Sequence, residues 1–335
     1  MSRRPTAREL ERREAGRPPV PGPPDPGSGE PARMLRRRGL RPRPAPLDLP
    51  FRADLPEPQA ARLAERLSHY AFRLFLRGAI LRPGGFAPRE ATRYLRAAPA
   101  RRMAEELVAL GLARRLGGGR FRLRRRARSF GGTLEWWLGR ELSRRLGLEV
   151  ALGLRSGAPG VGGDLDVVAA AEGKLLYLEV KSSPPKHVER AEVAAFLRRV
   201  RAIRPDVALF VVDTALRLSD KVLPMFAAEL GQAGAPRRVV RETWALTPHL
   251  YAVNARQDLL ENVGRAIAEG MKALSPAPPG RSPEGGGRPG RGPDGAPAAG
   301  AGRGSKALAR RLQGRAGRPW RRGARGRPSN RWRSR

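Results

Sequence analysis

Two acidic residues and a lysine lie on two neighbouring apolar segments of this 335-residue chain. Asp166 opens the segment Asp166-Val-Val-Ala-Ala, and Glu179 and Lys181 end the segment Leu175-Leu-Tyr-Leu-Glu-Val-Lys181. The turn-forming pair Glu172-Gly173 separates the two segments, so they predict a β-hairpin. Carboxylates at strand ends can hold a hard divalent cation, and a lysine beside them can stabilise negative charge that grows on an attacked phosphate.

Side-chain alternation along the second predicted strand supports this grouping. Successive side chains of a strand point to opposite faces, so Glu179 and Lys181 project side by side, together with Tyr177. The opposite, apolar face is made of Leu176, Leu178 and Val180. The alternative interpretation is an exposed strand whose charges form ordinary cross-strand pairs.

The sequence Glu-x-Lys is not informative alone, because the chain has a second copy, Glu172-Gly-Lys174, in the predicted turn. That copy falls in the turn between the two apolar segments and not within a segment. Lysine is also rare, since only six of the 67 Lys and Arg residues are lysine. A lysine at position 181 is therefore more informative than an arginine elsewhere.

A further carboxylate comes from the helix predicted over 133–146. Its leucines recur every four residues, and a rotation of 100° per residue about the helix axis puts Glu135 on the same side of the helix as these leucines. A carboxylate on a packing face is unfavourable unless it binds a metal or forms an ion pair. We expect one of these two roles for Glu135, and packing or domain-contact roles for Trp136 and Trp137.

The elements that must position these residues alternate between helix and strand over 130–275, as in an α/β domain. We predict helices at 133–146, 186–203, from a Ser219 cap to about 230, and 256–274, and strands at 165–170, 174–181, 207–212, near 238–246 and at 250–253.

Residues 57–126 predict a separate module. Helical periodicity covers 60–77, Pro88 can start a second helix, and a third is expected over 100–110. A hairpin follows, with Gly117-Gly-Gly119 at its tip. This order resembles a winged helix-turn-helix domain, which implies DNA contact by the third helix and the hairpin. The arginines so placed are Arg101, Arg102, Arg114, Arg115 and Arg120. The alternative is a module for protein docking.

The two ends of the chain have a different composition. Residues 1–55 are rich in Pro, Arg and Gly, and residues 276–335 are similar, so both are predicted to be disordered tails. From Arg281 onward there are 16 Lys and Arg against two Asp and Glu, with Trp320 and Trp332 among them. Two interpretations stay open, a nucleic-acid-binding tail and a solvated extension.

Composition narrows the class of protein. The net charge of +36 favours a polyanionic partner, with nucleic acid first. Cysteine is absent, which excludes disulfides, thiolate nucleophiles and cysteine-based zinc sites, and the three histidines lie far apart. No apolar run reaches the length of a membrane span, so we expect a soluble, cytoplasmic protein associated with the nucleoid.

The order of Glu135 on a helix, Asp166 on a strand and Glu179-Val-Lys181 on the next strand resembles the PD-(D/E)XK nuclease superfamily, in its Holliday-junction-resolvase-like and Mrr-like branches. The resemblance covers about residues 130–215. It implies a restriction-endonuclease-like mixed sheet flanked by helices.

The resemblance also implies a role for each matching residue. Asp166, Glu179 and Glu135 would bind Mg²⁺ or Mn²⁺, Lys181 would position or polarise the attacking water, and Ser183 would contact phosphate. Asp164 is the alternative first aspartate, and Leu165 stands where the superfamily has proline.

We therefore expect a metal-dependent DNA endonuclease of repair, recombination or restriction, acting on duplex, branched or single-stranded DNA. A homodimer is consistent with cutting both strands. The alternative is a non-catalytic DNA-binding protein that keeps the nuclease-like scaffold. A third hypothesis is an RNA- or ribosome-associated protein that acts through its tails.

Overall fold

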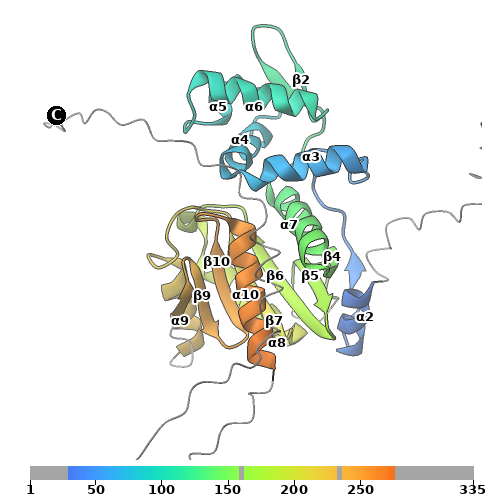
Figure 1. Ribbon diagram of the computed structural model, residues 1–335, viewed down its shortest axis with the longest axis vertical. Coiled ribbons are helices and arrows are strands. Elements are labelled where there is room, and N and C mark those ends of the chain that lie inside the picture. The colour runs from blue at the N-terminus through green and yellow to red at the C-terminus, as the bar shows by residue number, and fades with distance from the viewer. Residues whose placement is uncertain (1–28, 158–161, 232–235, 276–335) are drawn as a thin grey trace, which may run out of the picture. The chain divides into compact units, whose positions relative to one another are not determined.

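The fold of this computed structural model is a large mixed β-sheet with helices on both faces (Figure 1). The structure describes residues 29–157, 162–231 and 236–275. The eight strands have the order β1-β4-β5-β6-β7-β10-β9-β8. Their bounds are β1 Arg43–Pro44, β4 Glu149–Arg155, β5 Asp164–Ala171, β6 Lys174–Lys181, β7 Val207–Val212, β8 Arg237–Val240, β9 Thr243–Thr247 and β10 Leu250–Asn254. The predicted α/β class, with a large mixed sheet flanked by helices, is confirmed.

The hairpin of β5 and β6 forms as predicted, with antiparallel pairing that includes Val167 opposite Leu178. Its turn residues Glu172 and Gly173 both have positive φ, 52° and 70°, which suits a tight turn between twisted strands. β7 lies parallel to both β6 and β10 and is buried along its whole length. A strand buried on both faces needs the continuous apolar sequence Val-Ala-Leu-Phe-Val-Val that β7 has.

Two hydrophobic cores cover the two faces of the sheet. Leu176 and Leu178 belong to the core that contains α7 (Gly131–Leu146) and α10 (Leu259–Leu274). Tyr177 belongs to the opposite core, with α8 (Arg190–Ile203) and α9 (Val222–Leu230). The alternation predicted for β6 is therefore confirmed.

Residues 57–126 form four helices and a small hairpin. The helices are α3 Glu57–Ser68, α4 Tyr70–Ile80, α5 Pro88–Ala91 and α6 Ala97–Ala109, and the hairpin strands are β2 Ala113–Arg115 and β3 Phe121–Leu123. The single helix predicted over 60–77 is two helices, because His69 takes extended angles (φ −84°, ψ 117°). The predicted glycine-tipped hairpin is present, with Gly118 and Gly119 at positive φ.

Part of the predicted N-terminal tail is ordered, which corrects that prediction for residues 29–55. Helix α2 (Glu30–Arg37) buries Met34 and Leu35 against the sheet, and β1 pairs with β4. The Glu30 backbone N–H donates to Glu149 Oε1 over 2.7 Å. Few apolar residues suffice here because strands far along the chain cover them. The rest of the two predicted tails, residues 1–28 and 276–335, lies outside the described residues.

A buried ion-pair group connects the N-terminal helices to the sheet. Arg73 and Arg77 of α4 bind the two carboxylate oxygens of Asp213, just after β7, each over 2.9 Å. The Arg73 guanidinium also lies 4.9 Å from the ring centroid of Trp137, which is buried as predicted. The described residues belong to one compact unit, so the predicted boundary near 126–130 has a packed interface across it. None of the helices in the described part has the length and apolar character that a membrane crossing requires.

Candidate active site

The candidate site lies where β5 begins and β6 ends. The register of these strands puts Asp166 and Glu179 at the same level, one residue beyond the pair Val167 and Leu178. The Val180 backbone N–H donates to Asp166 Oδ2 over 2.7 Å. Asp166 is thereby fixed against the strand that carries the Glu-Val-Lys sequence.

Glu179 is buried and fully engaged by its neighbours. Its Oε1 lies 3.0 Å from Lys181 Nζ, and its Oε2 lies 2.6 Å from a guanidinium nitrogen of Arg199. The Tyr177 hydroxyl donates to Oε2, and Arg199 Nε donates to that hydroxyl over 2.9 Å. Two cations and a phenol therefore compensate a carboxylate that is only 2% exposed.

Lys181 is held between two carboxylates. Its Nζ lies 3.0 Å from Glu179 and 2.9 Å from Oε1 of Glu192, which belongs to α8. Burial lowers the pKa of Lys181, but attraction to Glu179 and the hydrogen bond with Glu192 outweigh burial and raise it. Lys181 is therefore a charged ammonium, suited to stabilising negative charge and not to accepting a proton.

Glu135 and Asp166 carry the charge that the chain leaves uncompensated. Burial, together with repulsion from Glu179 and Asp164, raises the pKa of Glu135 to about 7. Burial and repulsion from Glu179 and Glu135 raise the pKa of Asp166 well above its usual range. Within the described ranges, no Lys, Arg or His forms an ion pair with either carboxylate. Glu135 and Asp166 therefore repel each other within one acidic cluster, and a bound cation would relieve this repulsion.

The raised pKa of Glu135 predicts a pH-dependent stability difference. The folded protein holds the proton more tightly than the unfolded chain, so Glu135 destabilises the fold as pH rises from its ordinary pKa of 4.5 through about 7. In metal-free buffer we expect Glu135→Gln to raise the free energy of unfolding at pH 8 by roughly 3 kcal/mol, and to leave it unchanged at pH 4. Urea denaturation at the two pH values measures this, and an equal gain at both would contradict it.

The carboxylate oxygens of the cluster are of the kind that binds a hard divalent cation. Asp166 and Glu135 offer carboxylate oxygens without a cationic partner among the described residues, and such oxygens are the ligands that Mg²⁺ prefers. In the described ranges no group of three or more histidine or acidic side chains is arranged to hold a metal ion. Glu179 instead faces Lys181 and Arg199.

The other residues considered near the site are more exposed. Asp164 is exposed and lies 3.1 Å from Arg155, whereas Asp166 is half-buried, so Asp166 is the more enclosed of the two aspartates. Ser183 is exposed in the loop after β6. Lys174, from the second Glu-x-Lys copy, begins β6 and lies at the other end of that strand from Lys181.

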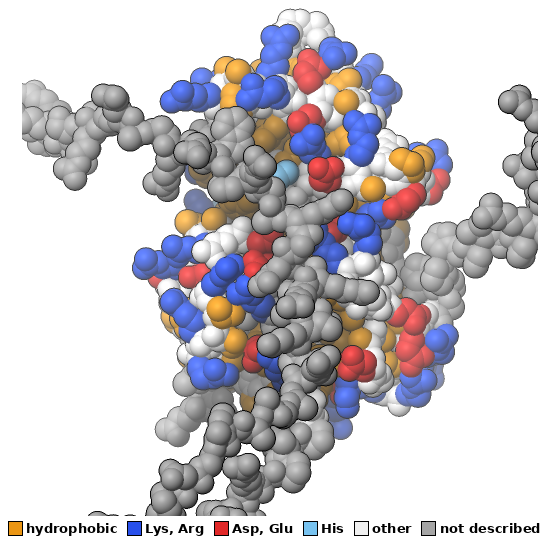
Figure 2. All heavy atoms as spheres, viewed as in Figure 1, with side chains coloured by type: hydrophobic (Ala, Val, Ile, Leu, Met, Phe, Trp, Pro, Cys, Tyr) orange, Lys and Arg blue, Asp and Glu red, His pale blue; other side chains and the backbone are white. Residues whose placement is uncertain are grey.

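The five arginines predicted to contact DNA divide into two groups. Arg115 lies 2.6 Å from Glu105, and Arg120 lies 3.2 Å from Glu90, so these two link the hairpin to α6 and α5. The other three, Arg101, Arg102 and Arg114, are exposed and have no acidic partner in the described part of the chain. In the upper part of Figure 2, where Figure 1 labels α5, α6 and β2, basic side chains lie on the surface with hydrophobic and acidic ones between them.

Sequence reasoning missed the role of α8. Glu192 and Arg199 are seven residues apart, which puts them on one face of the helix, beside the core residue Phe196. That spacing is the signal that could have found them. The abundance of arginine in this chain hides it, because one more arginine on a helix is not distinctive.

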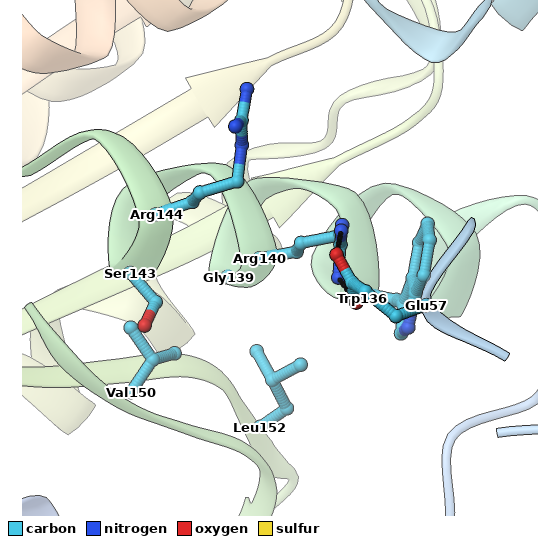
Figure 3. A pocket seen from close by; sticks show the side chains of 8 residues that line it. All are labelled: Glu57, Trp136, Gly139, Arg140, Ser143, Arg144, Val150 and Leu152. Carbon is cyan, nitrogen blue, oxygen red and sulfur yellow. Dashed lines mark hydrogen bonds and ion pairs between the residues drawn. The ribbon is translucent and has the colours of Figure 1, made fainter. Parts of the chain in front are cut away.

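A hollow of about 450 Å³ lies between α7 and β4, separate from the acidic cluster (Figure 3). It is lined by Glu57, Trp136, Gly139, Arg140, Ser143, Arg144, Val150 and Leu152. Arg140 forms an ion pair with Glu57 at its edge, and the Trp136 ring packs edge-on against Phe51. No residue predicted to bind metal or DNA lines this hollow.

Comparison with known proteins assigns no family to this chain. No family model matches it, and no curated protein matches it. Among solved structures, protein VC1899 from Vibrio cholerae is similar, with 17% sequence identity and a TM-score of 0.46. The similarity covers 72% of this chain and 62% of VC1899, so the chain spans less than two thirds of that protein.

Proposed function

We propose that this protein is a metal-dependent DNA endonuclease with a PD-(D/E)XK-type site in a restriction-endonuclease-like fold. The observation that supports it best is the meeting of Asp166, Glu179 and Lys181 on adjacent strands with Glu135 in the same electrostatic cluster. Helix, strand and strand contribute these residues in the order that the superfamily resemblance implies.

Each residue of the candidate site has a role in the proposed reaction. Asp166 and Glu135, with Glu179, would hold the cation, and a bound Mg²⁺ would activate a water and stabilise the leaving oxygen. The Lys181 ammonium would stabilise the negative charge that develops on the attacked phosphate. Glu192 and Arg199 would act as positioning residues, because they hold Lys181 and Glu179 in place.

The helices and hairpin before α7 would provide DNA binding as a winged-helix-like module. Arg101, Arg102 and Arg114 would contact phosphates or bases, since no described acid neutralises them. Association with the nucleoid and a homodimer that cuts both strands belong to this proposal.

The experiment is a cleavage screen over duplex, single-stranded and branched DNA, with Mg²⁺, Mn²⁺ or EDTA. We expect wild-type protein to cut at least one substrate class only when a divalent metal is present, and Asp166→Ala to be inactive. Asp164→Ala is the matched control and should retain activity, because Asp164 is exposed and paired with Arg155. Equal lack of cleavage by all three proteins, with DNA binding intact, would contradict an enzyme.

A non-catalytic DNA-binding protein is the second candidate, and one observation favours it. Both oxygens of Glu179 are engaged by Lys181, Arg199 and Tyr177, and Lys181 is also bound to Glu192. Such a closed ion-pair network can stabilise a scaffold without any metal. The cleavage screen separates the two candidates.

A further inference from the structure

A second surface feature, the Tyr94 groove, adjoins the loop that leaves the candidate site. It has a volume of about 480 Å³ and is formed by α4, α5, the residues after α5 and Pro184. Pro184 follows Lys181 by only three residues, so one wall of the groove continues directly from the strand that carries the predicted catalytic lysine. We define the groove by Leu81, Arg82, Arg89, Arg93, Tyr94 and Pro184.

The groove gathers the most exposed apolar side chains of the described residues. Leu81 is 67% exposed and Tyr94 is 65% exposed, higher than any other large hydrophobic residue there. The Arg93 guanidinium lies 5.2 Å from the Tyr94 ring centroid, and it donates a hydrogen bond to the Tyr94 hydroxyl over 3.1 Å. Leu81 and Tyr94 line the same groove, so these exposed apolar side chains are gathered in one place and are not scattered singly over the surface.

The charges of the groove favour an anionic partner. Its one acidic residue, Glu90, is paired with Arg120 at 3.2 Å. Among the described residues Arg82, Arg89 and Arg93 form no ion pair, although Arg82 attracts Glu90 over a longer distance. An apolar peptide would not need three cations, whereas the phosphates of a nucleic acid strand do.

We infer that the Tyr94 groove binds an unpaired nucleotide of the DNA substrate, with its base stacked on Tyr94 and its backbone held by the arginines. Aromatic side chains bind bases of single strands in this way, and the face of a base is accessible only when it leaves the duplex stack. The substrate class is therefore DNA with a single-stranded segment beside the cleaved bond. This inference rests on the proposed nuclease function.

The test measures affinity without cleavage, by fluorescence anisotropy of labelled oligonucleotides in EDTA with the full chain. We expect Tyr94→Ala to weaken binding of a single-stranded DNA about 5- to 100-fold, and to leave a blunt duplex unchanged. Tyr94→Phe should keep wild-type affinity because it keeps the ring. Leu216→Ala is the matched control, since Leu216 is 58% exposed and does not line the groove.

A further arm uses DNA with abasic sites in place of its bases. This change should weaken binding to wild type and not to Tyr94→Ala, because the ring stacks on the bases and not on the backbone. Unchanged affinity of Tyr94→Ala for single-stranded DNA would overturn the inference, even if a protein binds the groove. If wild type cuts DNA and this variant binds normally, the inference alone fails. If the variant loses single-strand binding and wild type cuts nothing, only the nuclease function fails.

Discussion

Replacing Lys181 by alanine is expected to lower the rate of DNA cleavage about 10³-fold while DNA affinity stays within about threefold of wild type, because one preorganised charge that stabilises a developing anion contributes on this scale. Lys181 is a charged ammonium held at 3.0 Å from Glu179 and 2.9 Å from Glu192, so its position is fixed before substrate binds. Single-turnover cleavage in Mg²⁺ measures the rate, and anisotropy in EDTA measures the affinity.

The chain offers a matched control for this experiment. Lys174 also stands two residues after a glutamate, but it begins β6, at the end of the strand far from Lys181. The glutamate before it, Glu172, belongs to a turn. Lys174→Ala should therefore cut DNA at the wild-type rate. Equal rates for wild type and Lys181→Ala would remove Lys181 from the chemistry.

The second large effect concerns stability. Arg73→Ala is expected to lower the free energy of unfolding by about 3 kcal/mol, because it removes one of the two cations that compensate a buried carboxylate and leaves only Arg77 paired with Asp213. Arg73 is 1% exposed and Asp213 is fully buried, and the guanidinium also binds two backbone carbonyls of α3. Urea denaturation followed by circular dichroism measures the change.

Arg52→Ala is the control, since Arg52 forms an ion pair with Asp54 at 2.6 Å on the surface. An exposed pair of this kind contributes little to stability, because solvent screens the two charges. If both variants lose equally little stability, the Asp213 group does not hold the N-terminal helices on the sheet. Its position is relevant to the site as well, because the Asp213 backbone N–H donates to the Lys181 carbonyl over 2.8 Å.

The central strands and the acidic residues could be predicted because their signals are local. Alternation along β6 fixed which side chains share a face, and Glu172-Gly173 fixed the turn. The same hairpin brings Asp166 level with Glu179, so the core of the candidate site follows from one short stretch of sequence.

The missed features depend on contacts that are distant in the sequence. Helix α2 looks like part of a Pro/Arg-rich tail, and only β4 and β5 give Met34 and Leu35 a surface to pack on. Strand β4 itself was missed, although it pairs with β5 along most of its length. Arg199 was hidden for a related reason, since its partners Tyr177 and Glu179 come from another element.

Divalent-cation binding by the acidic cluster underlies the proposed function, and calorimetric titration of Mn²⁺ at pH 8 tests it most directly. Wild type and Asp164→Ala are expected to bind the ion, and Asp166→Ala is expected to lose that binding, since Asp166 carries uncompensated charge inside the cluster. Equal Mn²⁺ binding by wild type and Asp166→Ala, or no binding by wild type, would contradict a metal-dependent site at these residues.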